Sequence, residues 1–150
     1  MSEILSVLQA HKYRTKTISQ LIKLAEKYFN TYIRMRDAIE CSFKCISCGM
    51  CFSTEQMHAG HFYSAGLHSK TRFSEDNVNG QCITCNTFLN GNENGYRIGL
   101  LQKIGIDRYQ SLKVDARTVH KWDRSELVGI IERYKRLSNE RERVIHNTSE

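Results

Sequence analysis

Proline is absent from this chain of 150 residues, and tryptophan occurs only once. Without proline there can be no proline-rich linker, no PxxP recognition motif and no cis-proline turn. The sequence also has no run of the ~18 apolar residues that a transmembrane helix needs, and its first ten residues lack the basic start of a signal peptide. We therefore expect a soluble, cytoplasmic protein without a membrane partner, of a length that suits one domain.

The excess of basic residues is unevenly distributed. The sequence holds 22 Lys and Arg against 16 Asp and Glu, a net charge of +6. Residues 1–40 carry 7 basic and 4 acidic groups and residues 96–150 carry 12 and 8, whereas residues 41–95 carry 3 and 4. The positive charge thus lies on both flanks of a near-neutral centre. It is a weak indication of a nucleic-acid partner, because many basic proteins bind none.

The N-terminal flank has the period of an amphipathic helix. From Ile18 onward, apolar residues recur every three or four positions, which predicts a helix over residues 18–40 with Thr17 or Ser19 as its N-cap. Basic residues such as Lys23 lie beside the apolar stripe. We favour a solvated helix face over contact with DNA for these residues, and both interpretations stay open.

The C-terminal flank, residues 96–143, is also predicted to be helical. Tyr96–Ile104 fits a short helix that Gly105 closes, and a second short segment follows it. The last helix has a clearer start, because Asp123 and Glu126 have the spacing of a capping box. The charged tail after this helix is expected to fray.

The centre, residues 41–95, is rich in cysteine, glycine and asparagine, a composition typical of a loop-rich metal-binding domain. Met57–Tyr63 and Asn77–Ile83 are the segments best suited to a two-stranded hairpin. A helix is expected to begin near Thr84 and to end before Gly91, a natural C-terminal stop.

Two CxxC units, Cys45–Cys48 and Cys82–Cys85, lie in this centre. Two intervening residues allow both thiolates of a unit to face one ion, and four thiolates form the closed tetrahedral shell of structural zinc. Buried reduced cysteines, a redox pair and an iron–sulfur cluster are the alternatives. Cys41 and Cys51 are left over, and we interpret them as packing or surface thiols.

Residues around the CxxC units follow an order found in one class of nucleases. The order resembles that of the zinc-stapled HNH (ββα-metal) nucleases. In them a catalytic His ends the first strand, an Asn follows in or near the second, and a His or Asn comes directly after the second CxxC. The corresponding residues of this chain are Cys45, Cys48, His61, Asn77, Cys82, Cys85 and Asn86.

Longer strings extend the resemblance over residues 18–140. The chain resembles the phage NinG family, also called Rap, in the strings FNTYIRMRDA, CISCG, AGHFYSAG, RFSEDNVNGQC, CNTFLNGN and YRIGLLQKIG. The resemblance implies a phage-encoded protein in the cytoplasm of a bacterial host that cleaves branched DNA, such as Holliday junctions, during recombination. DNA and recombination proteins are then the expected partners. Cutting two strands requires two active sites, which favours a homodimer.

The resemblance also implies roles for individual residues. His61 would be the general base, for which a neutral imidazole is chemically suited. Asn77 would brace the catalytic loop and orient His61. Asn86 would present its amide oxygen to a catalytic Mg²⁺ or Mn²⁺, since oxygen ligands suit these hard ions. Asn90 follows Asn86 by one helical turn and is a second candidate ligand.

One position departs from the HNH pattern. Many members have an acidic metal ligand directly before the catalytic His, where this chain has Gly60. His58 is a candidate replacement, but residues three apart in a regular strand point to opposite faces. Only a bulge, for which Gly60 is the natural place, would bring His58 and His61 together.

Three basic residues are candidates for contact with DNA. Lys70 and Arg72 lie in the loop that would pass the active site, and Arg72 could stabilise the charged transition state as a catalytic residue. A salt bridge from Arg72 to Glu75 or Asp76 is the equal alternative. Arg97 is a candidate contact to the phosphate backbone, and we interpret its neighbour Tyr96 as a core residue.

These observations predict an α+β fold, in which a small zinc-stapled ββα centre is flanked by N- and C-terminal helices. The predicted function is that of a metal-dependent, structure-specific DNA endonuclease. The alternative is a non-catalytic zinc-containing module that binds DNA or assists a recombination protein, and the missing acidic ligand favours it.

Overall fold

The structure, a computed structural model, describes residues 7–8 and 11–147. Most of the first ten residues, on which the expectation about a signal peptide rested, therefore lie outside the described residues. The chain divides into two compact units, one of residues 1–32 with 122–150 and one of residues 33–121. The single domain expected from the length stays a prediction. In the described part of the chain, no helix is both long enough and apolar enough to cross a bilayer.

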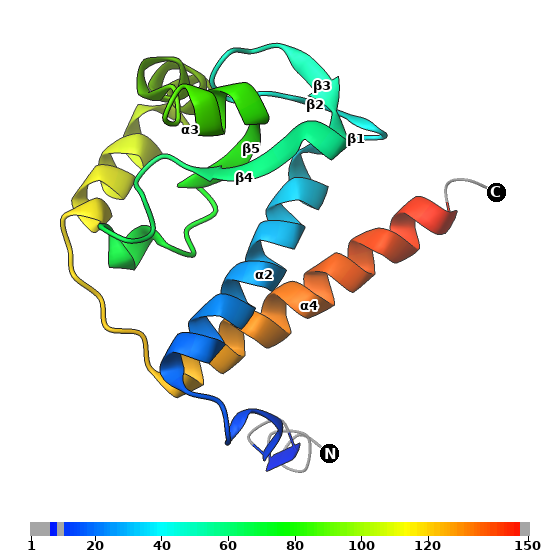
Figure 1. Cartoon of the computed structure of the whole chain (residues 1–150), viewed down its shortest axis with the longest axis vertical. Helices are drawn as coiled ribbons and strands as arrows, with labels where there is room; N and C mark the ends of the chain where they lie inside the picture. Colours follow the sequence, from blue (N-terminus) through cyan, green and yellow to red (C-terminus); the bar gives the residue numbers. More distant parts are fainter. Residues whose placement is uncertain (1–6, 9–10, 148–150) are drawn as a thin grey trace. The chain divides into compact units, whose positions relative to one another are not determined.

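The first unit is built on helix α4 (Arg124–Asn147) and on helix α2 (Ile18–Asp37) as far as residue 32, since the end of α2 belongs to the second unit. The two helices run in the same direction (Figure 1). Helix α2 begins as predicted, behind a reciprocal cap: Gln20 N–H donates to Oγ1 of Thr17 at 3.2 Å, and Thr17 N–H donates to Oε1 of Gln20 at 2.8 Å. It ends three residues before the expected residue 40 because a β-strand starts at Ala38.

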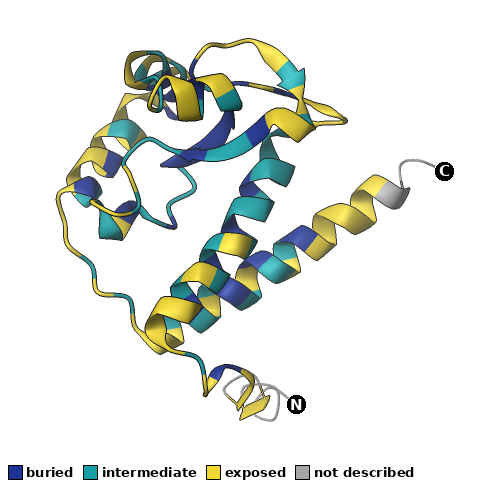
Figure 2. Ribbon diagram, viewed as in Figure 1, coloured by how far each residue is buried: buried dark blue, intermediate teal, exposed yellow. Residues whose placement is uncertain are grey.

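The predicted capping box starts helix α4. Asp123 N–H donates to Glu126 Oε2 at 3.0 Å, and Glu126 N–H donates to Asp123 Oδ1 at 2.9 Å. Apolar residues of α2 and α4 meet along one face, where the rings of Phe29 and Tyr134 lie 4.9 Å apart (Figure 2). The charged tail that was expected to fray is helical as far as Asn147.

The second unit contains two small antiparallel sheets. Strands β4 (Met57–His61) and β5 (Val78–Cys82) pair with each other, which confirms the predicted hairpin. A three-stranded sheet in the order β1-β2-β3 was not predicted, because its strands are only two or three residues long. They are β1 (Ala38–Ile39), β2 (Ser42–Lys44) and β3 (Cys51–Ser53). The turn between β2 and β3 carries the first CxxC unit.

The helical segments after β5 differ in part from the prediction. The helix expected from Thr84 is a π-helix of five residues, Thr84–Phe88, rather than an α-helix reaching Gly91. Helix α3 (Glu93–Ala116) follows, and Gly105, at φ 77°, interrupts it where the sequence predicted a helix end. The α+β class is confirmed. The ββα arrangement stays a prediction, since only the short π-helix directly follows the hairpin.

Two glycines allow α3 to pack on the backbone of the first CxxC unit. A Cβ atom at Gly95 would lie 2.3 Å from the carbonyl oxygen of Ser47, and one at Gly99 would lie 1.9 Å from that of Ile46. The first CxxC turn also covers the outer edge of β5, where Ile46 N–H donates to Gly80 O at 3.0 Å. The hairpin edge is therefore held by the CxxC turn, which α3 covers in turn.

Candidate functional site

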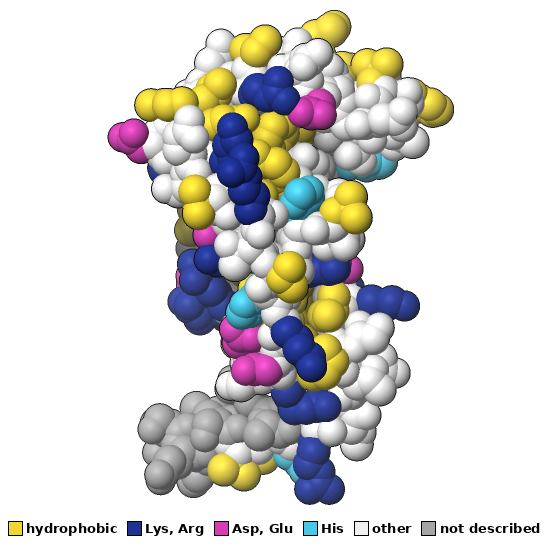
Figure 3. All heavy atoms as spheres, turned by 90° about the vertical axis from the view of Figure 1, so that its left-hand side faces the viewer, with side chains coloured by type: hydrophobic (Ala, Val, Ile, Leu, Met, Phe, Trp, Pro, Cys, Tyr) yellow, Lys and Arg dark blue, Asp and Glu magenta, His cyan; other side chains and the backbone are white. Residues whose placement is uncertain are grey.

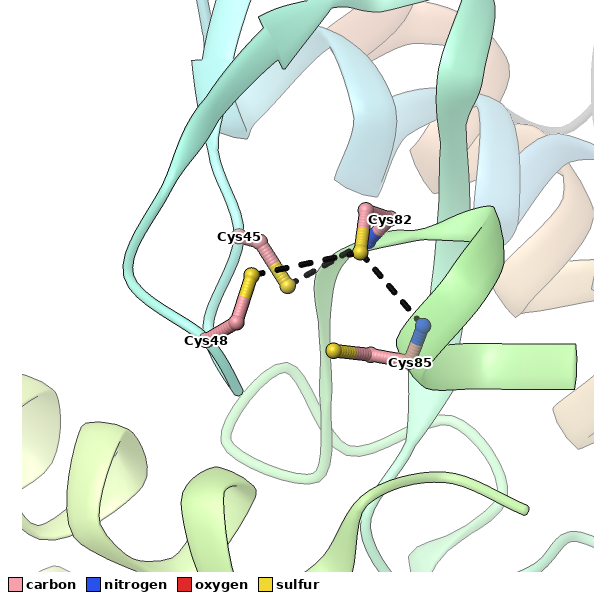
Figure 4. Close-up of side chains that lie close together, drawn as sticks. All are labelled: Cys45, Cys48, Cys82 and Cys85. Carbon is pink, nitrogen blue, oxygen red and sulfur yellow. Dashed lines mark hydrogen bonds between the residues drawn. The ribbon is translucent and has the colours of Figure 1, made fainter. Parts of the chain in front are cut away.

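The four cysteines of the CxxC units form one cluster (Figure 4). All four sulfur atoms lie within 4.8 Å of one another, and the sulfurs of Cys48 and Cys82 are 4.0 Å apart. Tetrahedral zinc, with Zn–S bonds of about 2.3 Å, requires sulfurs about 3.8 Å apart. The cluster fits such an ion, as predicted from the spacing. Cys41 and Cys51 are exposed and are not part of it.

The charge on the cluster also favours a cation. Burial alone would raise the pKa of Cys45, but backbone N–H groups of Cys48, Cys82 and Ser47 donate to its sulfur, so its pKa falls below the ordinary value. The pKa values of Cys48, Cys82 and Cys85 are raised, first by burial and also by the negative charge on Cys45. A bound dication would relieve this repulsion and allow all four thiols to ionise.

His61 ends strand β4 and faces the loop of residues 62–77. Its Nε2 atom lies 3.1 Å from the carbonyl oxygen of Arg72. A carbonyl can only accept, so Nε2 must carry a proton, and a neutral ring then has its lone pair on Nδ1. The loop therefore fixes both the tautomer and the orientation of the imidazole.

Asn77 organises the same loop from a fully buried position. Its Oδ1 accepts the N–H of Tyr63 at 2.8 Å, and its Nδ2 donates to the carbonyls of Tyr63 at 2.9 Å and Thr71 at 3.1 Å. These bonds join the start of the loop to its end. The carbonyl of Arg72, which holds His61, comes directly after Thr71.

His58 and Asn86 lie side by side, with the amide Nδ2 of Asn86 2.8 Å from Nδ1 of His58. The bulge that would have brought His58 to His61 is absent: β4 and β5 pair one to one from Met57 to His61. His58 therefore shares a face of the sheet with Gly60, and His61 points to the other face. The two candidate ligands, His58 and Asn86, are therefore neighbours, but strand β4 does not bend to bring His58 to His61.

Gln81 explains why residue 60 is glycine. A Cβ atom at Gly60 would lie 2.1 Å from Oε1 of Gln81. The Gln81 side chain is fully buried, and its Nε2 donates to Ser47 Oγ at 2.7 Å and Gly91 O at 2.6 Å. It cannot easily move aside, so this hairpin has no room for an acidic ligand directly before His61.

The candidate catalytic cation therefore has a sparse ligand set. Asn90 lies beyond the π-helix with a left-handed φ of 48°, so the α-helical spacing that paired it with Asn86 is absent. Among the described residues, the four cysteines are the one group of three or more His, Cys, Asp or Glu close enough to hold an ion. His58 and Asn86 offer two neutral ligands, so water and DNA phosphate would have to complete the shell of Mg²⁺ or Mn²⁺.

The three basic candidates all have partners within the protein. Lys70 pairs with Asp115 at 2.8 Å, and Arg97 pairs with Glu93 one turn earlier in α3. Arg72 donates from Nη2 to the carbonyl of Ala65 at 2.9 Å. Contact of these residues with DNA stays a prediction.

Comparison with known proteins identifies the family. The chain matches the sequence pattern of the family described as "Bacteriophage Lambda NinG protein" over residues 6–143. The chain belongs to the NinG family. It is 34% identical to protein ninG of Salmonella phage P22 over 128 residues, which are 85% of this chain and 61% of that protein. Against protein ninG of Escherichia phage lambda the identity is 33%, over 85% of this chain and 60% of the relative.

This NinG-family chain thus spans about three fifths of the length of the curated relatives that it matches. Protein ninG of Escherichia phage 933W gives the same picture, with 33% identity over 85% of this chain and 61% of that protein. No solved structure matches the chain. The names of these relatives state no reaction, so membership of the NinG family does not by itself assign one.

The NinG-family chain also has a polar network that the sequence interpretation missed. Lys103 donates to Asp37 at 2.9 Å and to Asn79 Oδ1 at 2.8 Å, and Arg36 donates to Asn79 Oδ1 at 3.0 Å. Asn79 in turn donates to the hydroxyl of Tyr96 at 3.1 Å. Arg36 and Asp37 lie in the string RMRDA, but no local pattern indicates a partner more than 40 residues away.

A cavity of about 530 Å³ lies beside the first CxxC turn of this NinG-family protein. The turn, Gly80 and one face of α3 line it, and Lys44 and Lys103 lie at its wall. None of the predicted catalytic residues lines it. We therefore assign the candidate site to the surface around His61 rather than to this cavity.

Proposed function

We propose that this NinG-family protein is a metal-dependent endonuclease that cleaves branched DNA during phage recombination. The observation that carries the proposal is the hydrogen bond from His61 Nε2 to the Arg72 carbonyl at 3.1 Å. It leaves the lone pair of a neutral imidazole on Nδ1, held in one orientation at the end of a strand. That is the state in which a histidine serves as a general base.

In the proposed reaction, Nδ1 of His61 takes a proton from a water molecule as its oxygen attacks the phosphorus. The new O–P bond forms in line with the breaking bond to the 3′ oxygen, which leaves with the electron pair and gives a 5′-phosphate product. Asn77 holds the loop that orients His61. A divalent cation bound to the phosphate would stabilise charge on it and on the leaving oxygen. Asn86 is the proposed protein ligand, but in this structure it lies beside His58, on the opposite face of the hairpin from His61.

The basic excess supports a polyanionic substrate. On the face drawn in Figure 3, Lys and Arg side chains are more extensive than Asp and Glu side chains. The two flanks of the sequence carry this excess, while residues 41–95 hold 3 basic and 4 acidic groups. We propose that the flanks contact the phosphate backbone, so binding should weaken steeply with salt and depend little on base sequence. Cleavage of two strands would require a homodimer, and recombination proteins are further proposed partners.

A second candidate is a non-catalytic zinc module that binds DNA or a recombination protein. Two observations favour it. His58 and His61 face opposite sides of the sheet. Among the described residues, no group of three or more His, Cys, Asp or Glu near His61 or Asn86 is close enough to hold an ion. In this case the zinc cluster and the loop of His61 would serve recognition alone.

One experiment separates the two candidates. Four-way junction, flap, single-stranded and linear duplex DNA would be incubated with the zinc-loaded protein, with and without Mg²⁺ or Mn²⁺. The proposal predicts metal-dependent cleavage of the branched substrates, lost in His61→Ala and retained in His11→Ala, since His11 is an exposed histidine elsewhere in the chain. Tight binding of the junction without cleavage in either metal would contradict the nuclease and support the module.

A further inference from the structure

We propose that Tyr96 is the positioning residue for His61, a role that rests on the proposed function of His61. Sequence patterning assigns Tyr96 only to the core of the helix that follows the zinc centre. In the structure the hydroxyl of this residue is buried against the carbonyl oxygens of Gly60, directly before His61, and of Asn77. The proposal is that this hydroxyl, rather than the ring alone, fixes the imidazole.

The hydroxyl of Tyr96 makes three contacts. It donates to the carbonyl oxygen of Gly60 at 2.7 Å, with the carbonyl of Asn77 as a longer second acceptor at 3.3 Å. It accepts a hydrogen bond from Nδ2 of Asn79 at 3.1 Å. Only 1% of Tyr96 is exposed, so water cannot replace these partners.

Two of these contacts bear directly on His61. The carbonyl of Gly60 belongs to the peptide group that joins Gly60 to His61, so holding it fixes the direction in which the His61 side chain leaves the strand. The carbonyl of Asn77 also accepts the N–H of Phe62 at 2.9 Å, just beyond His61. Tyr96 thus holds the residue before His61, Gly60, and Asn77 holds the residue after it, Phe62.

The network behind Tyr96 sets the direction of its proton. Asn79 Oδ1 accepts from Lys103 at 2.8 Å and from Arg36 at 3.0 Å, so the Asn79 amide nitrogen must face Tyr96 as a donor. The hydroxyl then has to use its own proton toward Gly60. Burial, and next the negative charge of Asp37, raise the pKa of Tyr96 and keep the hydroxyl a donor.

The test compares Tyr96→Phe with Tyr109→Phe. Both residues lie on α3 and pack against Phe62, with ring centroids 5.3 and 6.1 Å from it, but only Tyr96 contacts Gly60. Two-bond ¹H–¹⁵N correlation spectra of the zinc-loaded protein report the His61 tautomer without any substrate. We expect one tautomer, protonated at Nε2, in the wild type and in Tyr109→Phe, and averaged ring shifts in Tyr96→Phe.

The kinetic readout is single-turnover cleavage of a four-way junction. Loss of alignment should lower the maximal rate of Tyr96→Phe on the order of 10- to 100-fold, with half-saturating DNA concentration within about twofold of wild type because no DNA contact is removed. Tyr109→Phe should cleave at the wild-type rate. A Tyr96→Phe protein with wild-type spectra and rate overturns the proposal.

Two further outcomes are covered. If wild type does not cleave, the proposed nuclease fails, and the spectra alone decide whether Tyr96 orients His61. If Tyr96→Phe loses its zinc or its fold, Lys103→Met replaces it, since the Lys103 side chain is 39% exposed and donates to Asn79 and Asp37 rather than to Tyr96 or His61. Partial averaging of the His61 shifts in Lys103→Met supports the proposal, and unchanged shifts overturn it.

Discussion

Replacement of Asn77 by alanine is the sharpest test of how the loop of residues 62–77 is held. Asn77 is fully buried and makes three hydrogen bonds of 2.8, 2.9 and 3.1 Å to the backbone of Tyr63 and Thr71. At about 1 kcal/mol net for each bond, Asn77→Ala should lower the free energy of unfolding by about 3 kcal/mol. The loss should fall on the loop, and amide exchange from the loop should accelerate.

Urea unfolding of the zinc-loaded protein measures this loss, with Asn94→Ala as the control because Asn94 is exposed on α3. Asn77→Asp gives a second signature. Its carboxylate would face the carbonyls of Tyr63 and Thr71, so its folded pKa should be raised, and the penalty should be largest at neutral pH and shrink on acidification. A loss below about 1 kcal/mol in Asn77→Ala, equal to that of the control, would refute the bracing role.

Three other predictions follow from packing, charge and the zinc cluster. Gly60→Ala should lower the free energy of unfolding by about 1–3 kcal/mol because the added methyl group overlaps Gln81. In a double-mutant cycle, Gln81→Ala should relieve part of that cost. Strictly additive changes in the free energy of unfolding would exclude the overlap. Burial raises the pKa of Asp37, but the hydrogen-bonded Arg36 guanidinium and Lys103 outweigh it and lower the pKa overall. The stability that this ion pair contributes is therefore present above the ordinary carboxyl pKa of about 4 and is lost as the pH falls below that value. Acid titrations monitored by circular dichroism should show this loss in wild type and not in Asp37→Asn. Metal analysis should find about one zinc per chain. Replacement of Cys85 by serine, or treatment with a strong chelator, should unfold the hairpin of β4 and β5. Unchanged amide exchange in β5 after chelation would contradict a structural ion.

Features set by neighbours in the sequence were predictable. The 3.6-residue period located α2, the Asp123–Glu126 spacing located the start of α4, and Gly105 marked the break in α3. The first two depend on residues three or four positions apart, and the third on a single glycine. The cysteine cluster was also predictable, because two residues between paired cysteines already set half of its geometry.

Features set by contacts between residues distant in the sequence were not predictable. The regular register of β4 and β5 and the filling of the space at Gly60 by Gln81 follow from packing across 20 or so residues, and no local pattern encodes them. The network from Arg36 to Tyr96 joins three elements through buried polar groups. Sequence patterning assigned Tyr96 to the core correctly, yet it gave no indication that the hydroxyl has partners.

The most direct test of the central claim is the pH dependence of single-turnover junction cleavage in saturating Mg²⁺ or Mn²⁺. A neutral His61 acting as base predicts a rate that rises with pH through a single ionisation, and a loss of at least about 100-fold in His61→Ala together with the disappearance of that ionisation from the profile. Junction cleavage by His61→Ala at the wild-type rate, with the same pH profile, would contradict the account.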